Sequence, residues 1–593
     1  MLILLAASAF NSLTQRVHAE LRDRGHSVAV ELVLPGTRLA EAVERHRPDL
    51  VVAPMLKTAI PREVWSRHVC LVVHPGPVGD RGPSSLDRAL TDGADAWGVT
   101  VLQADEEMDA GPVWATAHCT LPPVGKSDAY RGEVSDAALT ALLLAVDRFA
   151  SGTHTPEPQR SGRALPYLRQ EERRIDWAHD PTDRVVRILR AADSQPGVLD
   201  ELLGGRWYLY GGHPEDGLRG RPGELLATRA GAICRATVDG AVWIPELRDG
   251  RRVPGDPATV KLPATLALAG RLPALPEIPA PPDTTTVDGG PRTWSDIRYR
   301  EDGEAGFLSF SFPGGAMSTE HCRRLLAAYR EACSRPTSVL VLGGARDFFS
   351  NGIHLGVIEA AADPAEESWA NVNAMDDLVE AVLTTTDRLV VAALGGNAAA
   401  GGAMLALAAD EVWMRSGAVL NPHYRLMGLY GSEYWTYTLP RRTGTGVAQR
   451  LMSDALPVGS EAARRLGLAD RTVDCTPQAF AEETARLAVR LADWPGTRSR
   501  VAGKKARREV DETLRPLAAH RRAELARMRE AFFDPQAPYH ALRRAFVRKE
   551  VPSGTPPHLA VPTRGRRTTA TSGRPPGITA PAQSDRAAGP AGC

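Results

Sequence analysis

The stretch HPGPVGDRGPSSLDRAL, from His74 to Leu90, follows the fourth apolar run of the chain, CLVV at residues 70–73. A histidine therefore closes a strand-like run, and three prolines and three glycines hold the next segment open. An imidazole in such a loop can move protons during acyl or formyl transfer when a carboxylate orients it. A structural histidine is the alternative, so the meaning of His74 depends on the residues around it.

Apolar runs alternate with helix-like stretches across residues 1–165, which predicts a parallel α/β sheet. The runs are LILLAASA, VAVELVL, DLVVAPM, CLVVHP and GVTVLQ. The first run has no basic segment before it, so we expect a buried strand and not a signal peptide. No GxGxxG follows this strand, which argues against a dinucleotide-binding domain.

The remaining chain divides by composition, and the whole predicts a multidomain α/β protein. Short strand-like pieces with regular turns indicate a small β-rich, OB-like domain at 166–271. A proline-rich segment at 272–295 is typical of a linker. A second α/β unit with trailing charged helices covers 296–550, and residues 551–593 have the composition of a disordered tail.

Charge and cysteine content limit the classes of partner. Lysine plus arginine and aspartate plus glutamate both number 71, so no net charge favours nucleic acid or an anionic membrane, and small-molecule partners are expected. The seven cysteines form no CxxC pair. We therefore expect a reducing, cytoplasmic location without disulfides or a metal site.

One uncharged segment, Leu389 to Ala409, is long enough to cross a bilayer. The four glycines and one asparagine of its central GGNAAAGGA instead indicate a strand, a tight turn and a buried helix start.

A second segment of the first unit, GVTVLQADEEMDAGPV at 98–113, places Asp109 on a loop. We expect it to meet His74 at the carboxyl edge of the sheet. With HPGPVGDRG, this segment resembles the 10-formyltetrahydrofolate-dependent formyltransferase and hydrolase superfamily, and the resemblance covers about the first 250 residues. It implies that His74 and Asp109 carry formyl transfer. It also implies that Met55, Leu56 and Lys57, in VVAPMLKTAIP, line a folate pocket.

One position departs from that family pattern. The family has an asparagine two residues before the histidine, as a donor to the tetrahedral oxyanion, whereas this chain has Val72. Valine offers no side-chain donor, so another group must take the role. The amide of Asn11, after the first strand, and a backbone N–H are the candidates.

The later α/β unit contains two glycine turns, in DFFSNGIHLG at 347–356 and in AAAGGAMLALAADE at 398–411. Each can be ordinary turn chemistry, but together they resemble the crotonase, or enoyl-CoA hydratase/isomerase, superfamily. That resemblance implies that the N–H groups of Ile353 and Gly401 polarise an acyl-CoA carbonyl.

Met404 and Tyr424 stand where hydratases of that superfamily have two glutamates, so hydration is not expected. The stretch NPHYRLMGLYGSEYWTYTLPRR, at 421–442, offers Tyr424 and Glu433 as catalytic candidates. Its other aromatics can equally be core residues.

The two halves together resemble a family of nickel-iron hydrogenase maturation proteins. The resemblance implies formyl transfer from 10-formyltetrahydrofolate to coenzyme A, followed by release of carbon monoxide for the hydrogenase iron. The partners would be nickel-iron hydrogenase or its maturation factors. Coenzyme A phosphates need cations and hydrogen-bond donors, and the candidates are Arg131, the Lys504–Lys505 pair, Ser194 and Gln195.

Two alternatives remain open on the sequence. One is a formyltransferase acting on an amine, with a structural crotonase unit. The other is a noncatalytic hydrogenase assembly factor, which the departures at Val72 and Met404 favour.

Overall fold

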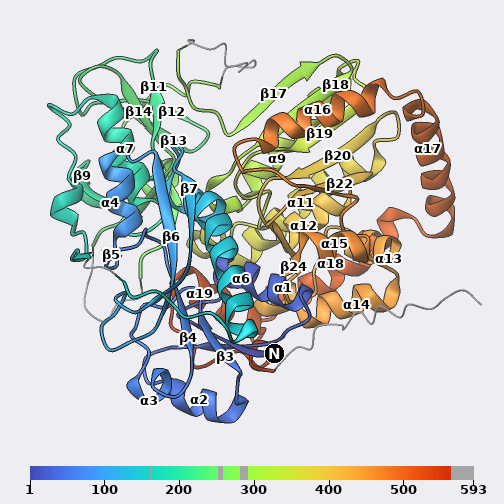
Figure 1. Cartoon of the computed structure of the whole chain (residues 1–593). Helices are drawn as coiled ribbons and strands as arrows, with labels where there is room; N and C mark the ends of the chain where they lie inside the picture. The colour runs from blue at the N-terminus through green and yellow to red at the C-terminus, as the bar shows by residue number, and fades with distance from the viewer. Residues whose placement is uncertain (160–161, 252–257, 281–290, 562–593) are drawn as a thin grey trace, which may run out of the picture.

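The computed structural model describes residues 1–159, 162–251, 258–280 and 291–561. Two α/β halves lie side by side, with a β-rich part next to the N-terminal half (Figure 1). The predicted multidomain α/β fold is confirmed.

The N-terminal half is built on a six-stranded sheet with the order β2-β1-β3-β4-β6-β7. Its strands are almost continuously apolar because helices cover both faces of the sheet. The strands are β1 (Leu2–Ala7), β2 (Ser27–Leu32), β3 (Leu50–Ala53), β4 (Cys70–His74), β6 (Ala96–Gln103) and β7 (Val113–Thr120). The helices are α1 (Ser12–Asp23), α2 (Leu39–His46), α3 (Arg62–Trp65), α4 (Ser85–Asp92), α5 (Lys126–Ala129), the π-helical turn η1 (Tyr130–Val134) and α6 (Ser135–Ser151).

The prediction that this sheet is parallel is only partly right. Strands β1 to β4 are parallel, but β6 runs antiparallel to both β4 and β7. The loop after β6 therefore starts beside Cys70, where Ala104 donates to the Cys70 carbonyl, and not beside His74. Asp109 reaches His74 because this loop folds back, and not because it sits at the carboxyl edge of a parallel strand.

The β-rich part consists of two four-stranded antiparallel sheets with α7 (Thr182–Ala192) packed into their core. One sheet has β9 (Val198–Leu202), β10 (Gly205–Tyr210), β15 (Glu246–Asp249) and β16 (Lys261–Pro263); the other has β11 (His213–Glu215), β12 (Leu225–Arg229), β13 (Ala232–Ala236) and β14 (Ala241–Ile244). Short elements around these sheets are β5 (Asp80–Arg81), paired with β8 (Arg163–Ala164), then η2 (Gln170–Arg173) and α8 (Ala264–Ala267).

The described parts of the predicted linker are packed against this β-rich part. Glu277 forms a bridge with Thr228, Arg292 pairs with Asp216, and Trp294 stacks on His213. Backbone pairing and ring stacking hold these residues in place, although they connect the β-rich part to the C-terminal half. Residues 281–290 of the predicted linker lie outside the described residues.

The C-terminal half has a six-stranded sheet, β17-β18-β19-β20-β22-β25, parallel except for β17, and a three-stranded sheet, β21-β23-β24. The strands are β17 (Ile297–Asp302), β18 (Ala305–Phe310), β19 (Val339–Gly343), β20 (Leu389–Leu394), β21 (Ala398–Ala399), β22 (Glu411–Arg415), β23 (Val419–Asn421), β24 (Val458–Gly459) and β25 (Arg471–Val473). The helices are η3 (Pro313–Gly315), α9 (Thr319–Ser334), α10 (Leu355–Ala360), α11 (Pro364–Thr384), α12 (Gly401–Leu407), η4 (Tyr424–Met427), α13 (Trp435–Thr443), α14 (Thr445–Asp454), α15 (Ser460–Leu466), α16 (Phe480–Asp493), α17 (Thr497–Leu514), α18 (Leu517–Phe533) and α19 (Pro538–Val547).

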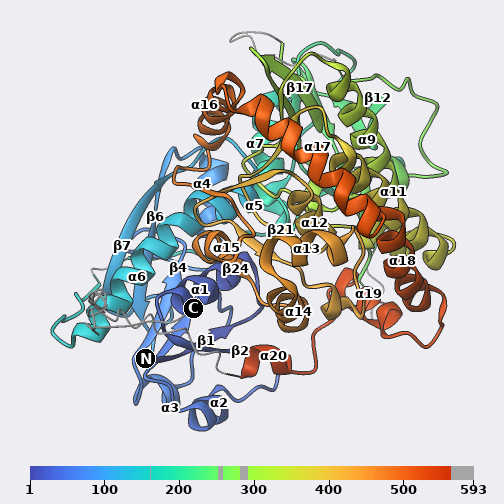
Figure 2. The ribbon, with the colours of Figure 1, turned by 90° about the vertical axis from the view of Figure 1, so that its right-hand side faces the viewer.

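The start of the predicted tail is ordered. Helix α20 (Pro557–Ala560) lies against β2 of the N-terminal half (Figure 2). Leu559 is buried there, and the Thr555 hydroxyl accepts from Leu32 N and donates to Glu31. The disorder prediction is therefore wrong for Thr555 to Ala560, and residues 562–593 lie outside the described part of the chain.

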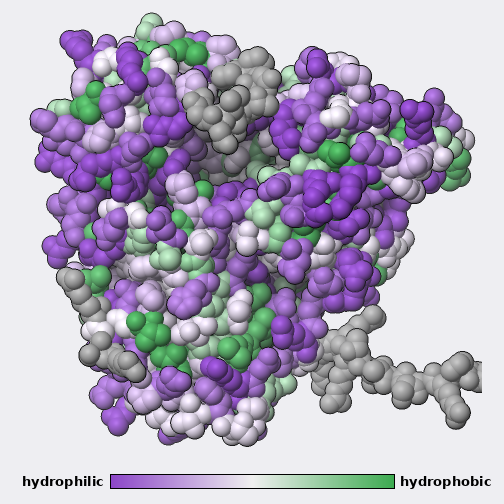
Figure 3. Space-filling model, turned by 45° about the horizontal axis from the view of Figure 1, so that its top comes forward, coloured by the Kyte–Doolittle hydropathy of each residue, from purple (hydrophilic) through white to green (hydrophobic). Residues whose placement is uncertain are grey.

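Among the described residues, no helix is both long enough and apolar enough to span a bilayer. The uncharged segment from Leu389 forms β20, a turn and α12, as predicted. The face shown in Figure 3 is largely hydrophilic, with hydrophobic residues in separate small groups.

Candidate active site

One cavity of about 2190 Å³ runs through the molecule and is lined by both α/β halves and by the β-rich part. Every site residue named from the sequence, except the lysine pair, lies on its wall. These residues are Asn11, Met55, Leu56, Lys57, His74, Asp109, Arg131, Ser194, Gln195, Ile353, Gly401, Tyr424 and Glu433. The motifs of the two halves therefore open into a common space.

His74, the last residue of β4, is buried between two carboxylates. Its Nε2 lies 2.9 Å from Asp80 Oδ2, and its Nδ1 lies 3.6 Å from Asp109 Oδ1. The predicted partner, Asp109, is thus beyond hydrogen-bond distance, and the closest carboxylate is one that sequence reasoning missed. Asp80 stands in the GDRG of the quoted stretch, six residues after His74, which is a signal that could have suggested it.

Asp109 is held by its own loop. Its φ of 59° is in the left-handed region, and its Oδ2 accepts a hydrogen bond from Gly82 N at 3.3 Å. Gln159 fixes the backbone of the loop by donating to the carbonyls of Asp109 and Gly111. A non-glycine residue that neighbouring residues hold in a strained backbone conformation, as Gly82 and Gln159 do here, is typical of a functional position.

The Asn11 amide is not beside His74. Its Oδ1 caps α1 by accepting from Thr14 N at 3.0 Å, and its Nδ2 lies 3.4 Å from the Tyr130 hydroxyl. Strand β3 separates the strand before Asn11 from the strand of His74, so these strands are about 10 Å apart. The oxyanion donor therefore stays a prediction, with the Asn11 amide and a backbone N–H as its two candidates.

The segment after β3 is anchored at both ends. Ser8 N donates to the Met55 carbonyl, and Lys57 N donates to the Ser8 hydroxyl, both over 2.9 Å. The peptide groups of Leu56, between these anchors, have no partner within the described structure. They are therefore free to hydrogen-bond a planar heterocycle in the cavity.

In the C-terminal half, two N–H groups lie close together without internal partners. A Cβ built on Gly352 would lie 3.0 Å from Gly401 N, so the loop carrying Ile353 approaches the start of α12 closely. The amides of Ile353 and Gly401 have no acceptor among the described residues. Two free donors side by side can polarise one carbonyl oxygen.

Neighbouring side chains position these donors. Ser350 Oγ accepts from Gly352 N, and the buried Asn371 accepts from His354 N and donates to the Met317 carbonyl. On the other side, Ala400 has a φ of 46°, and its N donates to the Asn421 carbonyl. The strained turn and the bonded loop hold the free N–H groups in place.

The Glu433 carboxylate lies over these donors. A Cβ on Gly401 would collide with Glu433 Oε1, which explains why glycine is required there. Oε2 accepts hydrogen bonds from the Tyr424 hydroxyl at 2.8 Å, from Ser432 Oγ at 2.8 Å and from Ser432 N at 3.2 Å. Because Oε2 is fully occupied, Oε1 is the oxygen available to a bound molecule.

Two further buried acids support this group, and sequence reasoning missed both. Asp376, on α11, accepts from Glu433 N at 2.8 Å, and Glu524, on α18, accepts from the N–H groups of Tyr434 and Thr436. They hold the backbone at Glu433 and Tyr434, whose φ values of 58° and 59° are both left-handed.

Burial sets the protonation behaviour of this cluster. Burial raises the pKa of Glu433, and burial together with the negative charge of Glu433 raises the pKa of Asp376 well above its ordinary value. Burial and the neighbouring Glu433 also raise the pKa of Tyr424 well above its usual range. Of the two candidate bases, Tyr424 is therefore a hydrogen-bond donor, and Glu433 is the one suited to accept a proton.

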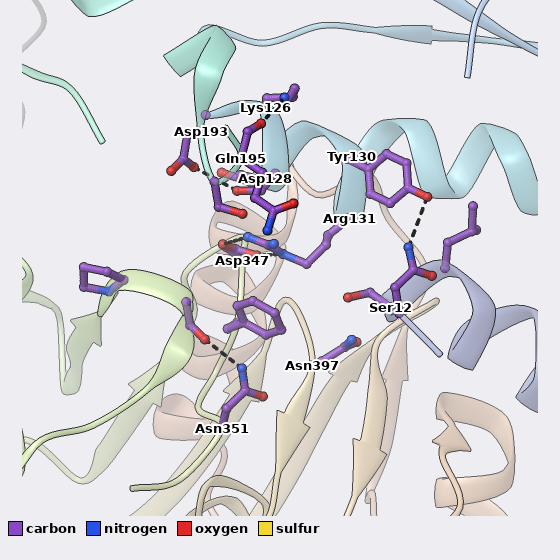
Figure 4. A pocket seen from close by; sticks show the side chains of 18 of the residues that line it. Ser12, Lys126, Asp128, Tyr130, Arg131, Asp193, Gln195, Asp347, Asn351 and Asn397 are labelled. Carbon is purple, nitrogen blue, oxygen red and sulfur yellow. Dashed lines mark hydrogen bonds and ion pairs between the residues drawn. The ribbon is translucent and has the colours of Figure 1, made fainter. Parts of the chain in front are cut away.

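The candidate phosphate contacts lie where the two halves meet (Figure 4). Arg131, on η1, reaches across to the loop after β19 and makes a bidentate pair with Asp347 at 2.7 and 2.6 Å. Phe348 lies under its guanidinium group, 4.2 Å away. Ser194 and Gln195 follow α7, and Lys126 donates to the Gln195 carbonyl. Arg131 thus faces the cavity but already has an acidic partner.

The lysine pair does not belong to this site. Lys504 is buried on α17, where it pairs with Asp410 at 2.6 Å and donates to the Arg388 carbonyl. Lys505 is exposed on the same helix, away from the cavity wall. The prediction that these lysines contact phosphate is therefore wrong, because α17 lies on the outside of the C-terminal half (Figure 2).

Three family models match the chain. The formyl transferase model matches residues 34–146, the formyl transferase C-terminal domain model matches 167–257, and the enoyl-CoA hydratase/isomerase model matches 314–545. The hydrogenase maturation factor HoxX of Bradyrhizobium diazoefficiens is 47% identical over 562 residues, which cover 94% of this chain and 96% of that protein. The chain belongs to the HypX/HoxX family of hydrogenase maturation factors.

Other relatives agree with this membership. The crystal structure of HypX from Aquifex aeolicus in complex with tetrahydrofolic acid has a TM-score of 0.90 and 42% identity, and the match covers 94% of this chain and 98% of that chain. The methionyl-tRNA formyltransferase of Roseiflexus castenholzii is 31% identical over 178 residues, which cover 29% of this chain and 56% of that protein. The HypX/HoxX fold thus joins formyltransferase-type domains to a crotonase-like domain in one chain.

Proposed function

We propose that this HypX/HoxX family member makes carbon monoxide for the iron of a nickel-iron hydrogenase. A formyl group would pass from 10-formyltetrahydrofolate to the thiol of coenzyme A, and the formyl thioester would then lose carbon monoxide. The observation that carries the proposal is the common cavity, which reaches from His74 to Glu433.

In the first site, the free peptide groups of Leu56 would hold the pterin and His74 would manage the proton. The thiol sulfur attacks the formyl carbon, the bond from that carbon to N10 breaks, and the thiol proton ends on N10. His74 and Asp109 both lie on the cavity wall, where they would meet the reacting carbon, and the turn of glycines and prolines after His74 would leave room for two substrates.

In the second site, the amides of Ile353 and Gly401 would polarise the formyl oxygen. Oε1 of Glu433 takes the formyl proton as the carbon–sulfur bond breaks, and it returns this proton to the departing thiolate. The products are carbon monoxide and free coenzyme A, and no oxidant is required. Hydrogen bonds from Tyr424 and Ser432 to Oε2 keep the carboxylate in position.

The arrangement also explains why hydration is not expected. Met404, a residue of α12, is fully buried in the core, and Tyr424 donates to Glu433 and does not take up a proton. Adding water to an alkene needs two opposed acid–base groups, and the described residues supply one carboxylate, Glu433, next to the two free amides.

Headspace carbon monoxide, trapped by reduced haemoglobin, tests the proposal. The purified protein receives 10-formyltetrahydrofolate with and without coenzyme A. Gas that needs coenzyme A and is absent with His74→Ala supports the two-step reaction. Consumption of the formyl donor without gas would show a transferase for another acceptor, and no consumption would favour an assembly factor.

A further inference from the structure

His74 has a partner that does not reach the cavity. Among the described residues, Asp109 lies on the cavity wall, whereas Asp80 does not. The imidazole therefore has one carboxylate behind it, 2.9 Å from Nε2, and another on the substrate side, 3.6 Å from Nδ1. Both carboxylates are largely shielded, with side-chain exposures of 14% and 13%.

The contact with Asp80 decides where the imidazole carries its proton. An ionised carboxylate only accepts hydrogen bonds, so Nε2 must be the protonated nitrogen when it bonds to Asp80. In the neutral ring, Nδ1 then presents a lone pair to the cavity.

The longer distance to Asp109 follows from the same assignment. A lone pair on Nδ1 and an ionised carboxylate are both acceptors, so no hydrogen bond can form between them, in accord with the 3.6 Å separation. A proton delivered to this place would bridge the two groups. The pair of Nδ1 and Asp109 Oδ1 is thus a receptor for one proton on the substrate side.

The local chain is built around the Asp80 contact. A Cβ on Gly76 would lie 2.5 Å from His74 Nε2 and closer still to Asp80 Oδ2. Asp80 N donates to the Pro77 carbonyl, and Asp80 and Arg81 pair with residues 163–164 as a short parallel ladder. The absence of a side chain at position 76 is therefore what lets the imidazole and the carboxylate meet.

We propose that Asp80 is the positioning residue of the formyl-transfer site: it holds His74 as the Nε2–H tautomer, so that Nδ1 and Asp109 together take the thiol proton. This inference rests on the proposed function. The S–H bond breaks as the S–C bond forms, and the proton held between Nδ1 and Asp109 moves to N10 as the C–N10 bond breaks. No proton is gained or lost overall.

Two variants disrupt the contact between His74 and Asp80 in different ways. Asp80→Asn keeps the shape but can donate an amide hydrogen to Nε2, which favours the wrong tautomer. Gly76→Ala keeps both partners and places a methyl group between them. Glu107→Gln is the matched control, because it breaks an ion pair with Arg81, next to Asp80, without touching His74.

The readouts are the ¹⁵N shifts of the His74 ring, assigned by loss of the signal in His74→Ala, and single-turnover transfer of formyl to coenzyme A. In the native protein we expect Nε2–H. Both variants should lose this tautomer and slow the transfer by about 100-fold or more. Glu107→Gln should change neither, and tetrahydrofolate should still bind all three.

Several results would overturn the inference. One is an Nδ1–H tautomer in the native protein, which needs no variant to detect. Another is an unchanged tautomer or transfer rate in a folded Gly76→Ala. If the native protein transferred no formyl to coenzyme A, the proposed function would fail, while the ¹⁵N shifts would still decide the role of Asp80.

Discussion

Tyr424 donates a hydrogen bond to Oε2 of Glu433 over 2.8 Å, and Oε1 of the same carboxylate faces Gly401. Tyr424 thus supports a carboxylate nine residues later in the chain. One oxygen of Glu433 is bound and the other is free, next to the two free amides. This division separates positioning from proton transfer and makes each testable.

Glu433→Gln should abolish carbon monoxide release but leave formyl transfer intact. Glutamine keeps the contacts of Oε2 in part but cannot accept the formyl proton, so release should fall by about 100- to 10,000-fold. Gas evolution and tetrahydrofolate formation, measured in the same assay, separate the two steps. Equal loss of both would place Glu433 outside the second step.

Tyr424→Phe should have a smaller effect. The ring stays packed and one hydrogen bond to a charged group is lost, which corresponds to a fall in gas release of about 10- to 100-fold. Were Tyr424 the base, its phenylalanine variant would instead be as inactive as Glu433→Gln. The comparison of the two variants at one pH decides between donor and base.

Burial of Glu433 should set the pH range of the second step. The pKa of Glu433 is raised, so the proton-accepting carboxylate is lost, and gas release falls, as the pH drops through a value above that of an ordinary glutamate. Burial and the charge of Glu433 raise the pKa of Asp376 well above its ordinary value, so Asp376 is uncharged while Glu433 titrates. Asp376→Asn should therefore leave the acidic limb of the gas-release profile in place.

Asparagine at position 376 can still accept from Glu433 N, so the backbone contact is preserved. Because the change removes a buried acid whose pKa is raised, thermal stability near neutral pH should not fall. A shift of the acidic limb to lower pH in Asp376→Asn would show instead that Asp376 carries a negative charge beside Glu433.

Short motifs, and the family resemblances that they carry, identified the residues on the cavity wall. A strand ending in His74 and glycine turns beside Ile353 and Gly401 can be recognised within short segments of sequence. The supporting contacts are of another kind. Asp376 reaches Glu433 from 57 positions away, and Glu524 reaches Tyr434 from 90 positions away. Such pairs depend on how helices pack, and no local period encodes that.

The same limit explains three errors of the sequence analysis, which concern the direction of β6, the role of Lys504 and the carboxylate nearest to His74. The antiparallel β6 has the same apolar run as its parallel neighbours, so strand direction was not readable. Lys504 is cationic like a phosphate ligand, but only the packing of α17 shows that Asp410 neutralises it. At the site itself, the closest carboxylate to His74 depended on a turn whose path is set by Gly76.

Asp347 should weaken the binding of coenzyme A. Arg131 is the proposed phosphate contact, yet both carboxylate oxygens of Asp347 accept hydrogen bonds from it across the interface between the two halves (Figure 4). A phosphate must therefore compete with Asp347 for the guanidinium group. The halves need not separate, because Arg346 independently binds Asp128 and Glu133 on the N-terminal side.

Asp347→Asn should tighten coenzyme A binding by about 5- to 10-fold, the worth of about 1 kcal/mol from one partly shielded ion pair. Burial, together with the charge of Asp347, raises the pKa of Asp128 to about 7. The variant lowers that pKa, so Asp128 becomes more fully ionised, which limits the gain in binding. Calorimetry with coenzyme A and with pantetheine, which has no phosphate, isolates the effect. The gain should appear only with coenzyme A, and Asp136→Asn, which breaks another pair between the halves, should not produce it. Weaker binding in Asp347→Asn would mean that the aspartate orients Arg131 for the phosphate and does not compete with it.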